Sequence, residues 1–144
     1  MLRLFIESSA FFAMCDSPPG ASRELFRLAL RGQVQLVTSH YALQETEIHL
    51  IGKRTQRSVV AFHYISRRPH WTIIDPTREE VIAAIPTTPD IADAPIVAAA
   101  KKAGVDAPVT FDRRHLIRQS VADYIGAVVT TPDQIVKRVR AGKG

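Results

Sequence analysis

Short hydrophobic runs alternate along the chain with segments whose apolar residues recur at helical spacing. Five runs have the length and apolar content of buried strands, at residues 2–6, 34–38, 71–74, 105–110 and 127–130. The intervening segments predict a helix after Ser39, a last helix from residue 131, and others at residues 8–15, 21–30, 53–68, 77–85 and 91–103. This alternation predicts an α/β fold, in which a five-stranded parallel sheet carries helices on both faces.

Residues that break or cap helices mark several element ends. The segment CDSPPG at residues 15–20 ends the first helix, Gly32 stops the second, and Pro69 ends the fourth. Ser39 is a suitable N-cap for the third helix. Because the chain shows no internal repeat or long linker, we expect its 144 residues to form a single domain.

A carboxylate accompanies several of the hydrophobic segments. Glu7 comes directly after the first strand run, and Asp112 follows the fourth in VTFDRRHL. Glu45 stands early in the helix that Ser39 caps, and Asp93 precedes an apolar helix in DIADAPIVAAA. Such positions lie at the carboxyl edge of an α/β sheet, where these folds place their sites.

The charge pattern suggests what such a site would bind. Several acids gathered at one edge repel one another, which favours a hard divalent cation such as Mg²⁺ or Mn²⁺ between them. The chain as a whole is nevertheless basic, with 19 Lys and Arg against 14 Asp and Glu, and Arg113 and Arg114 stand beside Asp112. A net charge of +5 favours a polyanionic substrate. Together these features indicate a metal-dependent nuclease.

Other kinds of site have less support. Cys15 is the only cysteine, which excludes an intrachain disulfide and a cysteine metal site. The five histidines lack zinc-binding spacing, so we expect His115 and the others to be structural or exposed, although His49 follows Glu45 by one helical turn and could contact the site. No nucleophile elbow is present. No apolar run approaches the roughly 20 residues of a membrane span, so we expect a soluble, cytoplasmic protein.

The order and spacing of these residues resemble the PIN domain family. Two stretches carry the resemblance, LRLFIESSAFFAMCDSPPGASRELFRLALRGQVQLVTSHYALQETEIHL and DAPIVAAAKKAGVDAPVTFDRRHL. The chain is most similar to bacterial PIN domains that form the nuclease half of toxin–antitoxin pairs. The resemblance implies that the metal-binding, catalytic acids are Glu7, Glu45, Asp93 and Asp112.

The resemblance also assigns neighbouring residues and partners. Ser9 falls on the small polar position after the first acid, and Thr110 belongs to the T-x-D turn. Asp90 is either an outer acid of the site or an ordinary turn residue. The resemblance implies an endoribonuclease that depends on Mg²⁺ or Mn²⁺ and cleaves RNA with a metal-activated water. It further implies a small antitoxin as protein partner and a homodimer as the assembly.

The first acid departs from the family pattern, because Glu7 stands where Asp is usual. The extra methylene moves the carboxylate by about one C–C bond, whereas Mg²⁺ demands near-ideal octahedral geometry. The alternative hypothesis is therefore a non-catalytic PIN-fold module that binds nucleic acid or protein with a degraded acid set. Taken singly, Asp93 could also be a helix-start acid, Asp112 a turn cap and Glu45 part of a solvated helix face.

Overall fold

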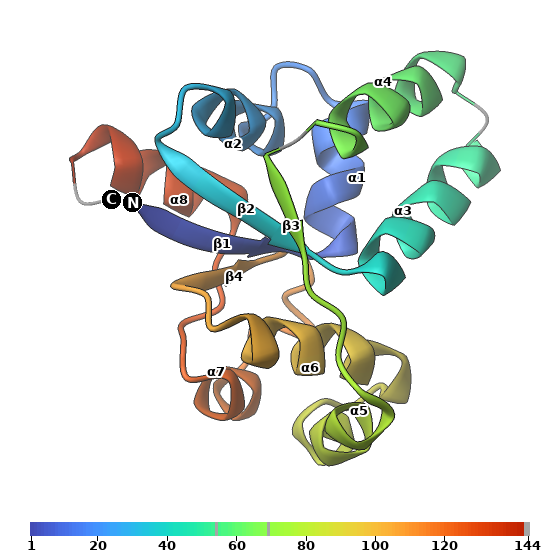
Figure 1. The fold of residues 1–144 in the computed structure, drawn as a ribbon, viewed down its shortest axis with the longest axis vertical. Helices are drawn as coiled ribbons and strands as arrows, with labels where there is room; N and C mark the ends of the chain where they lie inside the picture. The colour runs from blue at the N-terminus through green and yellow to red at the C-terminus, as the bar shows by residue number, and fades with distance from the viewer. Residues whose placement is uncertain (54, 69, 143–144) are drawn as a thin grey trace.

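Parallel strands form the centre of the molecule. The computed structural model describes residues 1–53, 55–68 and 70–142. Within these residues the sheet has four strands in the order β3-β2-β1-β4, each parallel to its neighbours (Figure 1). The strands are β1 (Leu2–Ile6), β2 (Val34–Thr38), β3 (Trp71–Ile73) and β4 (Ala107–Val109). Because they are parallel, their carboxyl ends meet at the same edge of the sheet.

The fifth strand predicted at residues 127–130 is wrong. Only Thr130 reaches the sheet, through an isolated parallel bridge to Val109. The segment is short because Gly126 ends the preceding helix in left-handed backbone, with φ at 81°. Val128 is 76% exposed and adds nothing to the core. Val129 is buried, but a single bridge does not make the ladder of a strand.

Helices cover both faces of the sheet. Side chains of β1 alternate between the faces, so Leu4 and Ile6 join one apolar core while Phe5 joins the other. The first core packs against α1 (Ser8–Asp16), α2 (Ala21–Leu30), α4 (Gln56–Ser66) and α8 (Pro132–Arg140). The second packs against α5 (Arg78–Ala84), α6 (Ala94–Ala103) and α7 (Gln119–Ile125), which lie on the opposite side of the sheet in Figure 1. α3 (His40–Lys53) contributes side chains to both cores.

The helix predicted at residues 53–68 starts in the wrong place. The preceding helix, α3, continues through Lys53, and α4 begins only at Gln56. Arg54, which the predicted helix contained, and its expected stop at Pro69 lie outside the described residues.

Two further differences concern the second face. The helix predicted at residues 91–103 begins with a 3-10 turn, η2 (Ile91–Asp93), and α6 follows it. α7 has no counterpart among the predicted elements, because it is short and Val121 is its only fully buried residue. A second 3-10 turn, η1 (Ile85–Thr87), follows α5.

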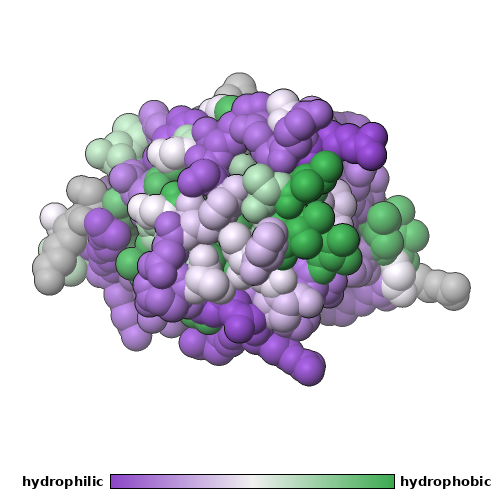
Figure 2. Space-filling model, turned by 90° about the horizontal axis from the view of Figure 1, so that it is seen from below, coloured by the Kyte–Doolittle hydropathy of each residue, from purple (hydrophilic) through white to green (hydrophobic). Residues whose placement is uncertain are grey.

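The lower side of Figure 1, where α5 and α7 lie, is shown as a surface in Figure 2. This side is mostly hydrophilic; its largest hydrophobic area lies right of centre in this view, and smaller ones lie towards the edges. None of the helices built from the described residues is long and apolar enough to cross a membrane.

Candidate functional site

A pocket of about 540 Å³ collects the predicted acids at the carboxyl edge of the sheet. Its walls come from the start of α1, the middle of α3, the η2 turn and the turn after β4. Five of its lining residues carry carboxylates. The described residues that line it are Glu7, Ser8, Ser9, Phe12, Glu45, His49, Asp90, Ala92, Asp93, Asp112 and His115. Of the predicted site residues, only Thr110 does not line this pocket.

Glu7 is a buried carboxylate that is fully hydrogen-bonded. It follows β1 directly, caps the N-terminus of α1 and is 7% exposed. Its Oε1 accepts the Ser9 N–H at 3.0 Å, the Thr110 hydroxyl at 2.6 Å and the Ser9 hydroxyl. Its Oε2 accepts the Ser8 hydroxyl at 2.7 Å. These four donors hold the carboxylate in one position.

Ser9 and Thr110 join the end of β1 to the turn after β4. The Ser9 Oγ accepts the N–H of Phe111 at 2.9 Å, and the Thr110 Oγ1 accepts the N–H of Asp112 at 2.9 Å. Each hydroxyl also donates to Glu7, so Glu7 and Asp112 are held by the same network. The two predicted auxiliary residues therefore fix the positions of two acids.

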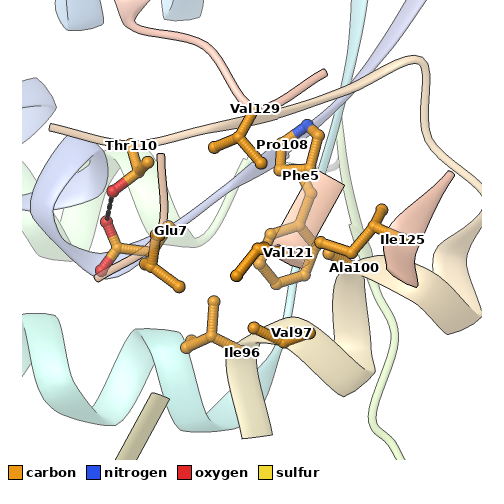
Figure 3. Close-up of a pocket in the computed structure, with 11 residues that line it drawn as sticks. Phe5, Glu7, Ile96, Val97, Ala100, Pro108, Thr110, Val121, Ile125 and Val129 are labelled. Atoms are coloured by element: carbon orange, nitrogen blue, oxygen red, sulfur yellow. Dashed lines mark hydrogen bonds between the residues drawn. The ribbon is translucent and has the colours of Figure 1, made fainter. Parts of the chain in front are cut away.

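The Glu7 side chain also touches the apolar core. Figure 3 shows its carboxylate directed at Thr110, with Phe5, Ile96 and Val129 around the space beside its stem. This space is about 10 Å³, which is room for about one water molecule and too small for a substrate. The extra methylene of Glu7 therefore packs at the boundary between the core and the acidic pocket.

Glu45 reaches the pocket from α3. As predicted, Ser39 precedes this helix, and its Oγ accepts the Ala42 N–H at 3.2 Å. Ser8 Oγ lies 3.1 Å from Glu45 Oε1 and 2.7 Å from Glu7 Oε2, so one hydroxyl stands between two carboxylates. Burial raises the pKa of Glu45, and the charges of Glu7, Asp93 and Asp90 raise it further, against the Ser8 hydrogen bond.

Asp93 carries the least compensated charge. One of its carboxylate oxygens, Oδ2, is buried and has no hydrogen-bond partner among the described residues. Burial raises the pKa of Asp93 to about 6, with further contributions from the charges of Asp112, Asp90 and Glu7, while His115 opposes the rise. Asp90, three residues earlier, uses its Oδ1 to accept the Ala92 N–H at 2.9 Å.

His115 also lines the pocket, whereas the sequence predicted only a structural or exposed residue. It follows Asp112 by three residues in a tight turn, where Asp112 Oδ1 accepts the N–H groups of Arg114 and His115 at 3.1 and 2.9 Å. The His115 Nδ1 lies 3.4 Å from Asp93 Oδ2 and 3.6 Å from Asp112 Oδ2. The D-x-x-H spacing after β4 was the available signal, but this spacing alone does not show that the imidazole faces the acids, because that depends on the shape of the turn.

The remaining sequence candidates divide by position. His49 lines the pocket, in line with its place one turn after Glu45. Arg113 and Arg114 are exposed beside Asp112 and do not line the pocket. They therefore lie beside the pocket, where they could attract a polyanion but could not contact a group bound inside it.

The donor set fits a divalent cation. It consists of carboxylate oxygens, which hard cations prefer, and it includes one buried oxygen that lacks a donor. Ligand atoms of Asp90, Asp93 and His115 all lie within 4.8 Å of one another, so a single ion could reach all three. A bound cation would offset the charge of Asp93 beyond what the nearby His115 does.

Comparison with known proteins relates this fold to one family. The sequence model described as PIN domain matches residues 3–114, a range that contains all four predicted acids. No curated protein matches the chain significantly.

Solved structures give the same fold. PAE2754 from Pyrobaculum aerophilum is 15% identical, with 97% of this chain and 90% of that chain covered and a TM-score of 0.68. VapC20 from Mycobacterium tuberculosis, described as a sarcin–ricin loop cleaving toxin, is 21% identical, with 77% and 91% covered and a TM-score of 0.59. A chain of FitAB bound to a DNA fragment is 11% identical, with 90% and 94% covered and a TM-score of 0.56. At these identities the likeness is one of fold.

The raised pKa of Asp93 predicts a pH-dependent effect on stability. Its pKa is about 6 in the folded protein against an ordinary value of 3.8, so ionised Asp93 destabilises the metal-free fold. The penalty is absent below the ordinary value and grows as the pH rises through 6. Asp93→Asn should therefore raise the free energy of unfolding at pH 7.5 by about 1–2 kcal/mol, after a discount for solvent in the open pocket, and by much less near pH 4.

Urea denaturation with EDTA at the two pH values measures this difference. Asp133→Asn, at an exposed position in the first turn of α8, is the matched control and should change the free energy of unfolding by less than about 0.5 kcal/mol at either pH. An Asp93→Asn effect that is independent of pH would contradict the assignment.

Glu7 should behave in the opposite way. Glu7→Gln keeps the size of the side chain but removes the charge that four donors stabilise, so we expect a loss of about 1–2 kcal/mol in metal-free buffer at pH 7.5. Glu47→Gln, on the exposed face of α3, should change the free energy of unfolding by less than about 0.5 kcal/mol. If Glu7→Gln stabilised the protein, repulsion among the acids would outweigh the hydrogen bonds to Glu7.

Proposed function

The chain belongs to the PIN domain family, and on that premise we propose that it is a metal-dependent endoribonuclease. The single observation that carries the proposal is the pocket in which five carboxylates converge, while one buried Asp93 oxygen has no hydrogen-bond donor among the residues that the structure describes. Such a concentration of negative charge is costly without a cation. Its place at the carboxyl edge of the sheet is also where α/β folds bind their ligands.

Asp93, Glu45 and Asp112 are the residues we propose to hold the metal, Mg²⁺ or Mn²⁺, with Glu7 as the fourth acid. When bound, such an ion lowers the pKa of a coordinated water and offsets charge that develops on the phosphate. The chain itself fixes the geometry, because Ser9 and Thr110 hold Glu7 and the Asp112 turn in register. In-line attack by water on the phosphodiester would leave a 5′-phosphate and a 3′-hydroxyl.

RNA is the substrate we propose. The chain is basic despite its acidic pocket, so positive charge is in excess on the rest of the molecule, and this attracts a phosphodiester backbone. Arg113 and Arg114 are exposed where the backbone would enter, beside Asp112. VapC20, which shares the fold, is described as cleaving the sarcin–ricin loop, and this supports RNA over DNA.

The biological role we propose is the toxin half of a toxin–antitoxin pair, with a small antitoxin as its protein partner. Support comes from the toxin description of VapC20 and from FitAB, which shares the fold and was solved bound to DNA. The proposed homodimer rests on the family resemblance alone.

A second candidate function is a non-catalytic module that binds nucleic acid or protein. The observation that favours it is the state of Glu7, whose two oxygens already accept four hydrogen bonds. A carboxylate engaged in this way has less capacity to bind a metal than a free one. A cleavage assay separates the two candidate functions, because only the nuclease cleaves RNA.

We predict that Asp93→Asn abolishes cleavage while the fold is kept. The amide preserves the size of the side chain but cannot supply the charge that holds a cation, so the rate on a fluorescent single-stranded RNA should fall at least about 100-fold. Wild type should cleave with Mn²⁺ or Mg²⁺ and stop on addition of EDTA. Asp133→Asn, purified in the same way, is the control and should match wild type.

Two outcomes would count against the nuclease. Cleavage that Asp93→Asn retains in full would place the activity elsewhere or in a contaminant. An absence of cleavage by wild type with either metal, together with measurable RNA binding, would favour the non-catalytic module.

A further inference from the structure

His115 stands between two carboxylates without forming a hydrogen bond to either. Its Nδ1 is 3.4 Å from Asp93 Oδ2 and 3.6 Å from Asp112 Oδ2, beyond the usual 2.7–3.2 Å of an N–H···O bond. Two ligands of one cation, each about 2.1 Å from it and 90–110° apart, are separated by roughly 3.0–3.4 Å. The spacing between Nδ1 and Asp93 Oδ2 is therefore that of neighbouring ligands.

The backbone holds His115 in this place. Its N–H donates to Asp112 Oδ1 at 2.9 Å, and its carbonyl accepts the Thr88 hydroxyl at 3.4 Å. The side chain is 29% exposed and lines the pocket, so it is neither a core residue nor a fully solvated one. The turn that presents Asp112 thus presents the imidazole to the same space.

Asp90 and Asp93 complete a compact donor set around this nitrogen. One ligand atom from each, together with a ring nitrogen of His115, lies within 4.8 Å of the others. Asp93 Oδ2 is buried without a hydrogen-bond partner among the described residues, which leaves it available for a cation.

We propose that His115 is a metal ligand, which with Asp90 and Asp93 forms a mixed nitrogen–oxygen subsite of the pocket. This inference rests on the proposed function, and it distinguishes between the two metals, Mg²⁺ and Mn²⁺, proposed for the nuclease. Mg²⁺ binds oxygen ligands almost exclusively, whereas imidazole nitrogen is a good ligand for divalent transition metals. The subsite should therefore bind Mn²⁺ more tightly than Mg²⁺, and the nitrogen should account for part of that preference.

Pulsed electron paramagnetic resonance of bound Mn²⁺ tests the proposal, because it detects coordinated ¹⁴N without any turnover. The wild-type protein loaded with Mn²⁺ should show ¹⁴N modulation from imidazole. His115→Gln should lose this signal, and its affinity for Mn²⁺ in calorimetry should fall at least about tenfold, while its affinity for Mg²⁺ changes less. His49→Gln, which alters another histidine of the same pocket, is the matched control and should keep the signal.

The outcomes separate this inference from the proposed function. If wild type binds Mn²⁺ without ¹⁴N modulation, His115 is not a ligand, and the nuclease proposal stands on its carboxylates. If the signal persists in His115→Gln and disappears in His49→Gln, the nitrogen ligand is misassigned. If wild type binds no Mn²⁺ at millimolar concentration, the proposed function fails and the inference fails with it. A wild-type spectrum without ¹⁴N modulation overturns the proposal without any variant, whereas a positive spectrum is assigned to His115 by comparing the two histidine variants.

Discussion

Five carboxylates share one pocket, and their mutual repulsion is the constraint on which the arrangement of this site depends. A parallel sheet places the ends of β1 and β4 side by side, and α3 and η2 bring further acids to the same edge. The fold thus brings negative charges close together, and each acid is stabilised only by the groups in its own surroundings. The acids differ in how far the surrounding donors compensate them.

Glu7 and Asp93 are the two extremes. Glu7 has hydroxyl and backbone donors at both of its oxygens, and two of the same side chains, Ser9 and Thr110, join the end of β1 to the turn after β4. Asp93 has a buried oxygen with no donor, and its pKa rises to about 6 mainly through burial. Asp112 has an intermediate number of donors, because its Oδ1 accepts two backbone N–H groups while its Oδ2 faces His115. Glu7 therefore helps to build the pocket, whereas Asp93 marks where a cation is needed.

The sequence predicts much of this arrangement because several signals are local. β1, β2 and α2 have the bounds that the apolar pattern indicated, and the order of the acids along the chain was enough to place them at one edge. The family resemblance that these acids suggested is confirmed by the family match. Their roles as metal ligands stay a prediction.

The errors have a common physical origin, because they depend on contacts between distant segments. The run at residues 127–130 looked like a strand, but it forms a single bridge to the sheet, at Thr130. His115 lacked any zinc-binding spacing, and its place in the pocket follows only from the way the turn after β4 meets η2. One of the hydrogen bonds to Glu7 likewise comes from Thr110, more than a hundred residues away in the chain.

The central claim is that the acidic pocket is a metal site with Asp93 at its centre. Anomalous diffraction from crystals soaked in Mn²⁺, recorded near the manganese edge, tests it most directly. We expect an anomalous peak in the pocket, about 2.1–2.3 Å from an oxygen of Asp93 and absent from crystals treated with EDTA. A map without a peak in this pocket at saturating Mn²⁺, in a crystal where the pocket is open to solvent, would contradict the account.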